Sequence, residues 1–241
     1  MTILLFDMDG VLTAPRQPMT DHLASVLIEL ASSYRCYVVT GSDYAKVQEQ
    51  IPARVRLRLA GVYACAGNEF WSEGEIVSAE QHDFDPALIQ TVEEWIAASS
   101  FRVRCGTQIE RRTGMLNVSV VGRGAPPELR QAYARHDKET GERGLLVEKI
   151  DRLFPAYEAT CGGQVSVDIA PKGWNKARVA EMLPKSEAVH FFADRVGPGG
   201  NDRPLAHALA ASSPVNRVSP VTGPEETQSL LEAYYHAGAA A

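Results

Sequence analysis

The sequence contains no apolar run that approaches the roughly 18 residues a helix needs to cross a bilayer. Its first residues, Met1–Asp7, also lack the basic region and the full apolar stretch of a secretory signal peptide. The net charge is −6, with 24 Lys and Arg against 30 Asp and Glu, which argues against a broad surface for nucleic acid or anionic membranes. We therefore expect a cytoplasmic protein that binds neither nucleic acid nor a membrane.

Cysteine is scarce, and its spacing is not that of a metal site. There are four cysteines, no Cys-x-x-Cys pair and no His cluster at zinc spacing beside them. Two of the four lie in apolar, strand-like runs, where a buried free thiol is the common case. We expect all of them to be reduced structural thiols: Cys36, Cys65, Cys105 and Cys161. With 45% hydrophobic and 22% charged residues, the composition also excludes a disordered chain, a collagen-like repeat and a coiled coil.

Continuous apolar runs towards both ends of the chain predict strands that are buried on both faces of a parallel sheet. Between the first two runs, apolar residues at helical spacing follow Thr20 or Asp21, either of which can cap a helix. Strand, helix and strand with short connections indicate an α/β domain. We therefore expect residues 1–77 and 173–241 to build one core domain. The apolar runs are Ile3–Phe6, Cys36–Val39 and Ala188–Phe192.

The middle of the chain predicts a second domain, inserted into the first. Residues 164–169 alternate polar and apolar side chains, as a half-buried antiparallel strand does. Residues 78–172 are therefore expected to form an α+β cap domain with an antiparallel sheet, one face of which is solvated or lines a cleft. Further strands are expected at residues 107–110 and 115–121, and helices at residues 86–98, 126–143 and 145–154.

Polar residues directly follow three of the predicted strands. Because the carboxyl ends of parallel strands converge on the ligand crevice of an α/β sheet, we expect these side chains to meet. An Asp-Gly pair alone is most often a turn, but two aspartates after a buried strand, matched by another acidic strand end, favour a site. The residues are Asp7 and Asp9, then Thr40 and Ser42, then Asp194, Asn201 and Asp202.

Three crowded carboxylates repel one another and need a counter-ion, and hard oxygen ligands select Mg²⁺. Such a cation also lowers the repulsion between a carboxylate nucleophile and a phosphoryl anion. Asp7 can then attack phosphorus and form an aspartyl-phosphate, while Asp9 gives a proton to the leaving oxygen and recovers it from the next acceptor. Lys176 can balance charge at the phosphorus, although a lone Lys at a helix start is usually solvated.

Three arginines and one polar strand face in the middle segment suit a phosphorylated ligand. Arginine forks bind phosphate oxygens bidentately, and Arg123, which follows an apolar pair, fits the wall of a cleft better than Arg112 or Arg130. Ser166 and Asp168 lie on one strand face and can reach a single ligand. From these residues alone, solvated surface charges and a solvent-facing strand remain the alternative interpretation.

Together these motifs resemble the haloacid dehalogenase (HAD) superfamily and, more closely, its eukaryotic-type phosphomannomutases. The superfamily signature is Asp7-Met-Asp-Gly10, Thr40-Gly-Ser42, Lys176, and Asp194 with Asn201-Asp202. The closer likeness lies in Phe6-Asp-Met-Asp-Gly-Val-Leu-Thr-Ala-Pro-Arg-Gln17, Gly41-Ser-Asp43, Gly114-Met-Leu-Asn-Val-Ser119, Gly122-Arg123, Gly162-Gly-Gln-Val-Ser-Val-Asp168, Gly173-Trp174, Phe191-Phe192 and Pro198-Gly-Gly-Asn-Asp202. These segments cover nearly the whole chain in order.

The resemblance implies a HAD-like Rossmannoid core with an inserted cap. It also implies a Mg²⁺-dependent enzyme that interconverts mannose 6-phosphate and mannose 1-phosphate, and extends to the glucose pair in some members. The reaction would pass through an aspartyl-phosphate and use a hexose 1,6-bisphosphate as activator. Such enzymes belong to GDP-mannose biosynthesis and commonly form homodimers through the cap.

The resemblance also implies a role for each matching residue. Asp7 would be the nucleophile and Asp9 the general acid/base, with Lys176 on the phosphoryl group. The residues that would hold or surround Mg²⁺ are the Asp7 side chain, the Asp9 backbone carbonyl, Asp194, Asn201 and Asp202. The residues that would bind the substrate are Arg16, Thr40, Ser42, Arg112, Arg123, Arg130, Ser166 and Asp168.

Some positions depart from the family pattern and keep a second function open. Val11 replaces the usual Thr after Asp-Gly, Thr40 stands where Gly-Gly is usual, and Asn175 replaces the Asp before the motif lysine. Because Val11 and Thr40 are more typical of superfamily phosphatases, a sugar-phosphate phosphatase with the same aspartyl-phosphate core is the alternative. A non-catalytic sugar-phosphate-binding protein is the third. Alanines stand where the family holds a second cation, so no second ion is expected: Ala206, Ala208 and Ala211.

Overall fold

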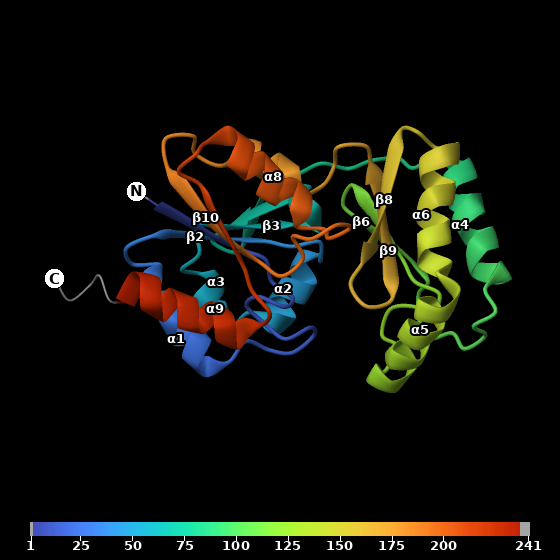
Figure 1. The fold of residues 1–241 in the computed structure, drawn as a ribbon, viewed down its shortest axis with the longest axis horizontal. Helices are drawn as coiled ribbons and strands as arrows, with labels where there is room; N and C mark the ends of the chain where they lie inside the picture. Colours follow the sequence, from blue (N-terminus) through green and yellow to red (C-terminus); the bar gives the residue numbers. More distant parts are fainter. Residues whose placement is uncertain (1, 237–241) are drawn as a thin grey trace. The chain divides into compact units, whose positions relative to one another are not determined.

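The structure, a computed structural model that describes residues 2–236, divides into two compact units along the chain (Figure 1). The core unit comprises the residues up to 79 and those from 175 onwards, and the insert unit comprises residues 80–174. The boundaries expected from the sequence, at residues 78 and 172, lie two residues from these.

The core unit is built on a seven-stranded sheet with the strand order β11-β10-β1-β2-β3-β4-β5. Strands β11, β10, β1, β2 and β3 are parallel, whereas β4 and β5 add an antiparallel hairpin that the sequence did not predict. The central strand β1 is buried on both faces, which explains its unbroken apolar run. The strands are β1 (Thr2–Phe6), β2 (Arg35–Val39), β3 (Gly61–Ala64), β4 (Glu69–Ser72), β5 (Glu75–Ala79), β10 (Ala188–Ala193) and β11 (Arg217–Pro220).

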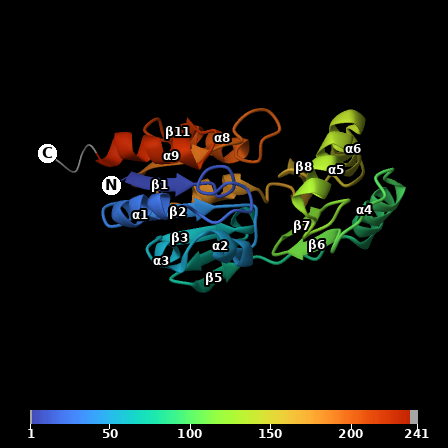
Figure 2. The ribbon, with the colours of Figure 1, turned by 90° about the horizontal axis from the view of Figure 1, so that it is seen from below.

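Helices cover both faces of this sheet (Figures 1 and 2). One face packs against α1 (Asp21–Leu30), α2 (Tyr44–Gln50), α3 (Ala53–Arg56) and α9 (Pro224–Leu231), and the other against α7 (Val179–Met182) and α8 (Arg203–Ser212). Three short helices complete the described part of the unit: η1 (Cys65–Gly67), η2 (Lys176–Arg178) and η3 (Glu232–His236). Residues 176–182 thus form a 3₁₀ turn followed directly by one short α-helix. Of the two candidate caps for α1, Thr20 is the one used, because its hydroxyl accepts a hydrogen bond from the backbone of Leu23.

The insert unit is a four-stranded antiparallel sheet, in the order β6-β7-β9-β8, with two helices packed on it. Apolar side chains of α4 and α6 meet those of the sheet in a core of their own, and α5 joins α6 through Gly141, which has a left-handed backbone. The strands are β6 (Ile109–Arg112), β7 (Met115–Val118), β8 (Tyr157–Gly162) and β9 (Ser166–Pro171), and the helices are α4 (Pro86–Ala98), α5 (Pro127–Thr140) and α6 (Glu142–Leu153). A mainly parallel core sheet with an antiparallel second sheet in an inserted unit is thus the architecture that the sequence predicted.

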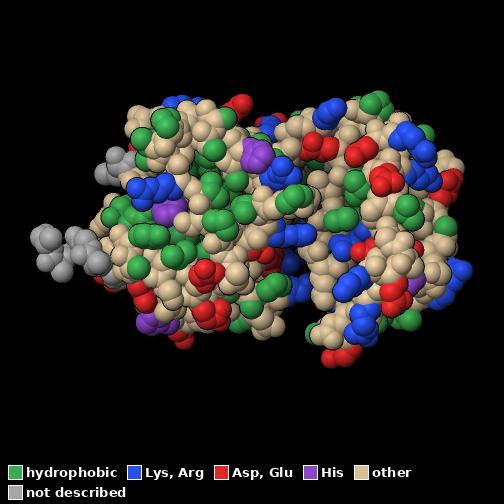
Figure 3. Space-filling model, viewed as in Figure 1, with side chains coloured by type: hydrophobic (Ala, Val, Ile, Leu, Met, Phe, Trp, Pro, Cys, Tyr) green, Lys and Arg blue, Asp and Glu red, His purple; other side chains and the backbone are tan. Residues whose placement is uncertain are grey.

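Side chains of both signs are intermixed on the face of the molecule drawn in Figure 3. Among the described residues, no helix combines the length and the apolarity that a membrane crossing requires. The four cysteines, all within the described part of the chain, are free thiols as expected, and Cys36 and Cys65 are buried.

The register of the core sheet determines where the candidate site lies. Phe6 at the end of β1 pairs with Phe192 of β10 on one side and with Val38 of β2 on the other. The residues that follow these strands therefore emerge at the same edge of the sheet, as parallel strands require.

Candidate active site

Asp7 and Asp9 are held by a tight turn that leaves β1. The backbone N–H of Asp7 still donates to Phe192 O of β10 at 3.0 Å, while the carbonyl of Met8 accepts bonds from the residues that follow. Gly10 has φ +89°, and a Cβ atom there would clash with the Asp194 carboxylate. Glycine is therefore required at this position both for its backbone conformation and to let the Asp194 side chain approach.

Lys176 lies between two carboxylates at the centre of the site. Its Nζ is 2.6 Å from Asp7 Oδ1 and 2.6 Å from Asp202 Oδ1, and the side chain is 2% exposed. Burial alone would lower the pKa of Lys176, but its ion pairs with Asp202 and Asp7 outweigh this and raise the pKa above its usual value. Lys176 is thus a permanent buried cation.

Burial also acts on Asp7, the predicted nucleophile. It raises the pKa of Asp7 to about 8, and the nearby charge of Asp202 adds to the rise while Lys176 opposes it. Because only the ionised carboxylate is nucleophilic, further positive charge beside Asp7 would favour the form that the predicted role requires.

The oxygen atoms available around Asp7 fit a hard divalent cation. Carboxylate oxygens of Asp7, Asp194 and Asp202 lie within 4.8 Å of one another. Asp194 Oδ1 and Asn201 Oδ1 are buried with no hydrogen-bond partner among the described residues, which leaves both free to act as ligands. Burial and the Asp202 charge raise the pKa of Asp194 to about 6, so a bound cation would relieve the repulsion among these groups. The set consists entirely of oxygen donors, as Mg²⁺ prefers.

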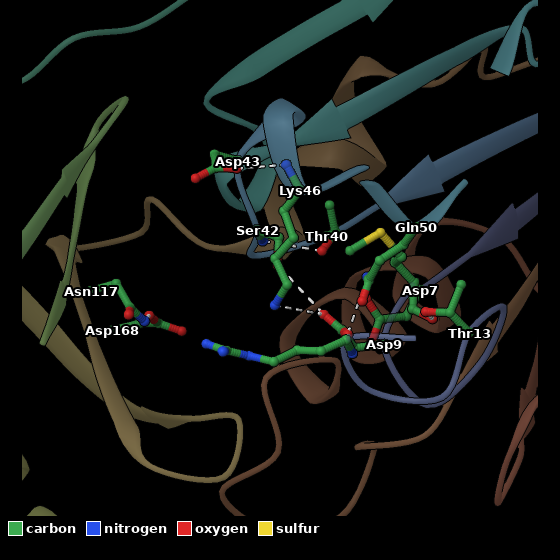
Figure 4. Close-up of polar contacts among 12 residues, drawn as sticks. Asp7, Asp9, Thr13, Thr40, Ser42, Asp43, Lys46, Gln50, Asn117 and Asp168 are labelled. Carbon is green, nitrogen blue, oxygen red and sulfur yellow. Dashed lines mark hydrogen bonds and ion pairs between the residues drawn. The ribbon is translucent and has the colours of Figure 1, made fainter. Parts of the chain in front are cut away.

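The side chain of Asp9 lies outside that cluster and is held separately (Figure 4). Asp9 Oδ1 accepts from the backbone N–H of Arg16 and from Gln50 Nε2, both at 3.3 Å. Asp9 Oδ2 accepts from Ser42 Oγ at 3.4 Å and lies 3.7 Å from Lys46 Nζ. The predicted proton donor is therefore contacted on both oxygens.

The loop after β2 contributes Thr40 and Ser42, which are both buried. Thr40 Oγ1 accepts from the backbone N–H of Ser42 at 3.1 Å, so the loop is fixed from within. The loop is also held by η1, the short helix after β3, where Cys65 and Ala66 donate their backbone N–H groups to the carbonyls of Ser42 and Thr40. Both of these residues have a positive φ, a strained conformation for a residue other than glycine.

In the insert unit, two of the predicted arginines share one acidic partner. Arg112 Nη2 is 2.8 Å from Glu110 Oε2, and Arg123 forms an ion pair with the other oxygen of the same carboxylate. Arg130 is placed differently, since its Nε donates to Gln164 Oε1 at 3.3 Å. Glu110 thus holds two guanidinium groups close together, that of Arg112 on β6 and that of Arg123 in the loop after β7.

The predicted polar strand face lies on β9. Ser166 and Asp168 are both half-buried there, and Asn117 of the neighbouring strand donates to Asp168 Oδ1 at 2.5 Å. A Cβ atom at Gly162 of β8 would clash with the Asp168 carboxylate, so this glycine provides the space for it.

Comparison with known proteins agrees with these observations. The sequence model of a family described as eukaryotic phosphomannomutase matches residues 23–236. The chain belongs to this family. It is 33% identical over 244 residues to a probable phosphomannomutase of Caenorhabditis elegans, covering 96% of this chain and 94% of that one. It is 34% identical over 241 residues to a phosphomannomutase of Arabidopsis thaliana, covering 97% and 96%. The resemblance in the motifs is confirmed, and the chain is an enzyme of the phosphomannomutase class.

Solved structures support the fold class. The C-terminal domain of a trehalose-6-phosphate phosphatase from C. albicans superposes with a TM-score of 0.69 at 17% identity, covering 96% of this chain and 91% of that one. A haloacid dehalogenase-like hydrolase from Bacteroides thetaiotaomicron superposes with a TM-score of 0.62 at 11% identity, covering 97% of this chain and 99% of that one. At such identities the likeness concerns the fold alone, and it confirms the HAD-like core.

Four residues with evident roles in these contacts were not predicted from the sequence. Lys46 and Gln50 contact Asp9, Glu110 pairs with the arginines, and Asn117 binds Asp168. Lys46 and Gln50 did carry a signal, since they are four residues apart on a helix that directly follows the Thr40-Gly-Ser42 loop.

Proposed function

We propose that this chain is a Mg²⁺-dependent phosphomannomutase that interconverts mannose 6-phosphate and mannose 1-phosphate through an aspartyl-phosphate, with a hexose 1,6-bisphosphate as activator. The observation that supports it most is the close arrangement of Asp7, Lys176 and Asp202, all buried, with the partly buried Asp194, in a chain of the phosphomannomutase family. Asp7, the backbone carbonyl of Asp9 and Asp194 would hold the cation, with Asn201 and Asp202 around it. When bound, Mg²⁺ would neutralise charge on the phosphoryl oxygens.

The first half-reaction follows from the two aspartates. An oxygen of Asp7 attacks phosphorus, the bond between phosphorus and the sugar oxygen breaks, and the proton of Asp9 goes to that oxygen. Lys176 offsets negative charge beside the attacked group throughout. The second half-reaction reverses these events, because Asp9 takes the proton from a sugar hydroxyl, whose oxygen then attacks the phosphorus on Asp7.

A mutase must also bind the phosphate that is not reacting. We propose that Arg112 and Arg123, held together by Glu110, take this phosphate, with Arg130 adding a third guanidinium group. Ser166 and Asp168 would bind sugar hydroxyls, and Thr40, Ser42 and Arg16 would contact the substrate from the core unit. Once phosphorylated Asp7 has passed its phosphoryl group to a hexose monophosphate, the resulting hexose bisphosphate has to reverse so that its other phosphate reaches Asp7.

A sugar-phosphate phosphatase with the same aspartyl-phosphate chemistry is the second candidate, and Val11 favours it. Val11 is fully buried in the apolar core. Because it stands where family members usually have a threonine, the hydroxyl group that they place beside the nucleophile is missing here. In a phosphatase, water would take the phosphoryl group from Asp7 in place of a sugar hydroxyl.

The test is ³¹P NMR of mannose 6-phosphate with the protein and Mg²⁺, with and without catalytic glucose 1,6-bisphosphate. We expect a resonance of the 1-phosphate that depends on the bisphosphate. Inorganic phosphate as the sole product would establish the phosphatase. The Asp7→Asn variant is the control, because an amide cannot form the acyl phosphate; turnover in this variant would exclude Asp7 as the nucleophile.

We further propose that the protein acts in the cytoplasm, in GDP-mannose biosynthesis, as a homodimer formed through the insert unit. These proposals are supported by the family relationship alone. Sedimentation equilibrium of the full chain tests the last, and a monomer at micromolar concentration would contradict it.

A further inference from the structure

Two side chains of α2 that the reaction scheme leaves without a role both contact Asp9. Lys46 and Gln50 are four residues apart, so they lie on the same face of the helix. Gln50 Nε2 donates to Asp9 Oδ1 at 3.3 Å, and Lys46 Nζ lies 3.7 Å from Asp9 Oδ2 (Figure 4). The helix thus supplies an amide donor to one carboxylate oxygen and a cation to the other.

Packing alone does not account for a glutamine at position 50. The residue is 3% exposed and lies on the buried face of α2, together with Tyr44 and Val47. Its Oε1 has no hydrogen-bond partner among the described residues, and an unsatisfied buried acceptor lowers stability. A methionine of similar volume would avoid this loss. The amide is therefore explained by the bond that it donates to Asp9.

The contacts with α2 complete a set of donors that restricts the carboxyl group of Asp9. The backbone N–H of Arg16 shares Oδ1 with Gln50, and Ser42 Oγ shares Oδ2 with Lys46. With different donors on the two oxygens, rotation of the group breaks contacts on both. We propose that Gln50, assisted by Lys46, is a positioning residue that holds Asp9 in the orientation from which it protonates the leaving oxygen. The inference rests on the proposed function and deepens it.

The consequence is a dependence on the leaving group. When the bond between phosphorus and a sugar oxygen breaks, that oxygen needs the proton of Asp9, because a free alkoxide is a poor leaving group. When the leaving group is p-nitrophenolate, a stable anion, the same attack by Asp7 needs no proton. Loss of Gln50 should therefore impair phosphorylation of Asp7 by a hexose phosphate and spare phosphorylation by p-nitrophenyl phosphate.

The experiment compares Gln50→Met with Gln48→Met, a matched control at an exposed position of the same helix. Phosphorylation of Asp7 is followed in single turnovers of the full chain with Mg²⁺, using glucose 1,6-bisphosphate or p-nitrophenyl phosphate. For Gln50→Met we expect a rate about 100-fold lower with the bisphosphate and within about threefold of wild type with the aryl phosphate, because a small misplacement of a reacting group costs about this factor. The concentration that gives half of the maximal single-turnover rate should change little, and Gln48→Met should match wild type with both substrates.

Equal losses with both substrates would indicate a structural role for Gln50 and would overturn the inference. An unchanged rate with both substrates would overturn it as well. Far-UV circular dichroism and thermal unfolding check that the variant is folded. If it is not, Lys46→Met and Lys46→Arg give the same comparison at an only partly buried side chain: the arginine should recover much of the hexose-dependent loss. If wild type itself phosphorylates Asp7 with neither substrate, the proposed function fails, and this outcome is distinct from failure of Gln50 alone.

Discussion

Lys176 shows that the surroundings of a side chain decide what it does. A lysine at the start of a short helix is usually solvated, yet this one is 2% exposed and contacts Asp7 and Asp202. Nothing in its local sequence predicts this, because the two carboxylates come from residues far away along the chain. The buried cation determines which charges the rest of the site can carry.

Replacing Lys176 should therefore lower stability as well as activity. In Lys176→Met, two carboxylates remain buried without their partner, and we expect the free energy of unfolding to fall by about 3–5 kcal/mol. Guanidinium unfolding in EDTA measures this. Lys172→Met, at an exposed position, is the control and should have almost no effect. A loss below about 1 kcal/mol at position 176 would be inconsistent with a buried ion pair that matters for folding.

Arg123 allows the two candidate functions to be separated. Arg123→Ala removes one of the two guanidinium groups on Glu110, and each charge-assisted hydrogen bond lost to a phosphate should cost about 1.5–3 kcal/mol. Hexose phosphate isomerisation, measured by ³¹P NMR, should fall much more than hydrolysis of a small aryl phosphate, which has no second phosphate. Equal losses in both reactions would argue against binding of the distal phosphate by Arg123.

At the scale of elements, α2 is the helix that connects fold and site. Asp43 caps it by accepting from the backbone N–H of Lys46 at 2.8 Å, and Tyr44 stacks on Trp71 with ring centroids 3.9 Å apart. These contacts fix the start of a helix whose inner face carries Lys46 and Gln50.

Removal of the cap should lower both the stability of the protein and its activity. Asp43→Ala is expected to lower the free energy of unfolding by about 1 kcal/mol. Because the first turn of α2 also carries Lys46, kcat should fall with little change in KM. Denaturant titration and steady-state kinetics measure the two effects, with Glu49→Ala, at an exposed position of the same helix, as the control. An unchanged stability would show that the first turn does not depend on this hydrogen bond.

A buried histidine makes the end of the core sheet sensitive to pH. His190 of β10 contacts Tyr235 of η3 at 2.6 Å and Ser219 of β11 at 2.7 Å, one through each ring nitrogen. Burial, with a smaller contribution from the Arg217 charge, lowers its pKa to about 4 from the usual 6.5. Neutral imidazole suits both contacts, since one ring nitrogen donates and the other accepts.

Stability should therefore fall on acidification through this histidine. Between pH 6.5 and 4 the unfolded chain binds a proton at position 190 that the folded chain does not, so the free energy of unfolding should decrease by about 3 kcal/mol over that range. The raised pKa of Asp7 contributes a slope of opposite sign. The measurement is thus the difference between wild type and His190→Gln in guanidinium unfolding at pH 4.5 and 7. A difference that does not change with pH would contradict the prediction.

Elements with one clear apolar pattern could be predicted from the sequence, and elements without one could not. The strand β1 and the helix α4 stand where their patterns placed them, whereas the hairpin of β4 and β5 was missed because its strands lack a continuous apolar run. The motif residues at the ends of strands were predictable because parallel strands end at one edge. Asn117 was not, since its contact with Asp168 depends on the register between β7 and β9, which packing sets and a single strand does not specify.

At the scale of the whole molecule, the chain consists of two units with separate cores. The core sheet needs residues from both ends of the chain, because β10 lies beside β1. The insert unit needs neither end, since apolar residues of α4, α6 and its own sheet pack together.

The insert unit should consequently fold alone. Residues 80–174 expressed as a fragment are expected to give a dispersed amide NMR spectrum and a cooperative thermal transition. Leu116→Ala, in the centre of that core, should lower the free energy of unfolding of the fragment by about 2–5 kcal/mol. A fragment without a cooperative transition would show that the insert depends on the core unit for stability.

Gly10 determines how freely this site can vary. A Cβ atom at position 10 is disfavoured for two separate reasons, the positive φ of the backbone and the nearness of the Asp194 carboxylate. A second substitution that removes one of these constraints therefore leaves the other in place. A library randomised at position 10 and selected for turnover should return glycine even when neighbouring positions are randomised as well. The residue at position 10 should therefore remain glycine, whatever substrate the enzyme is selected to accept.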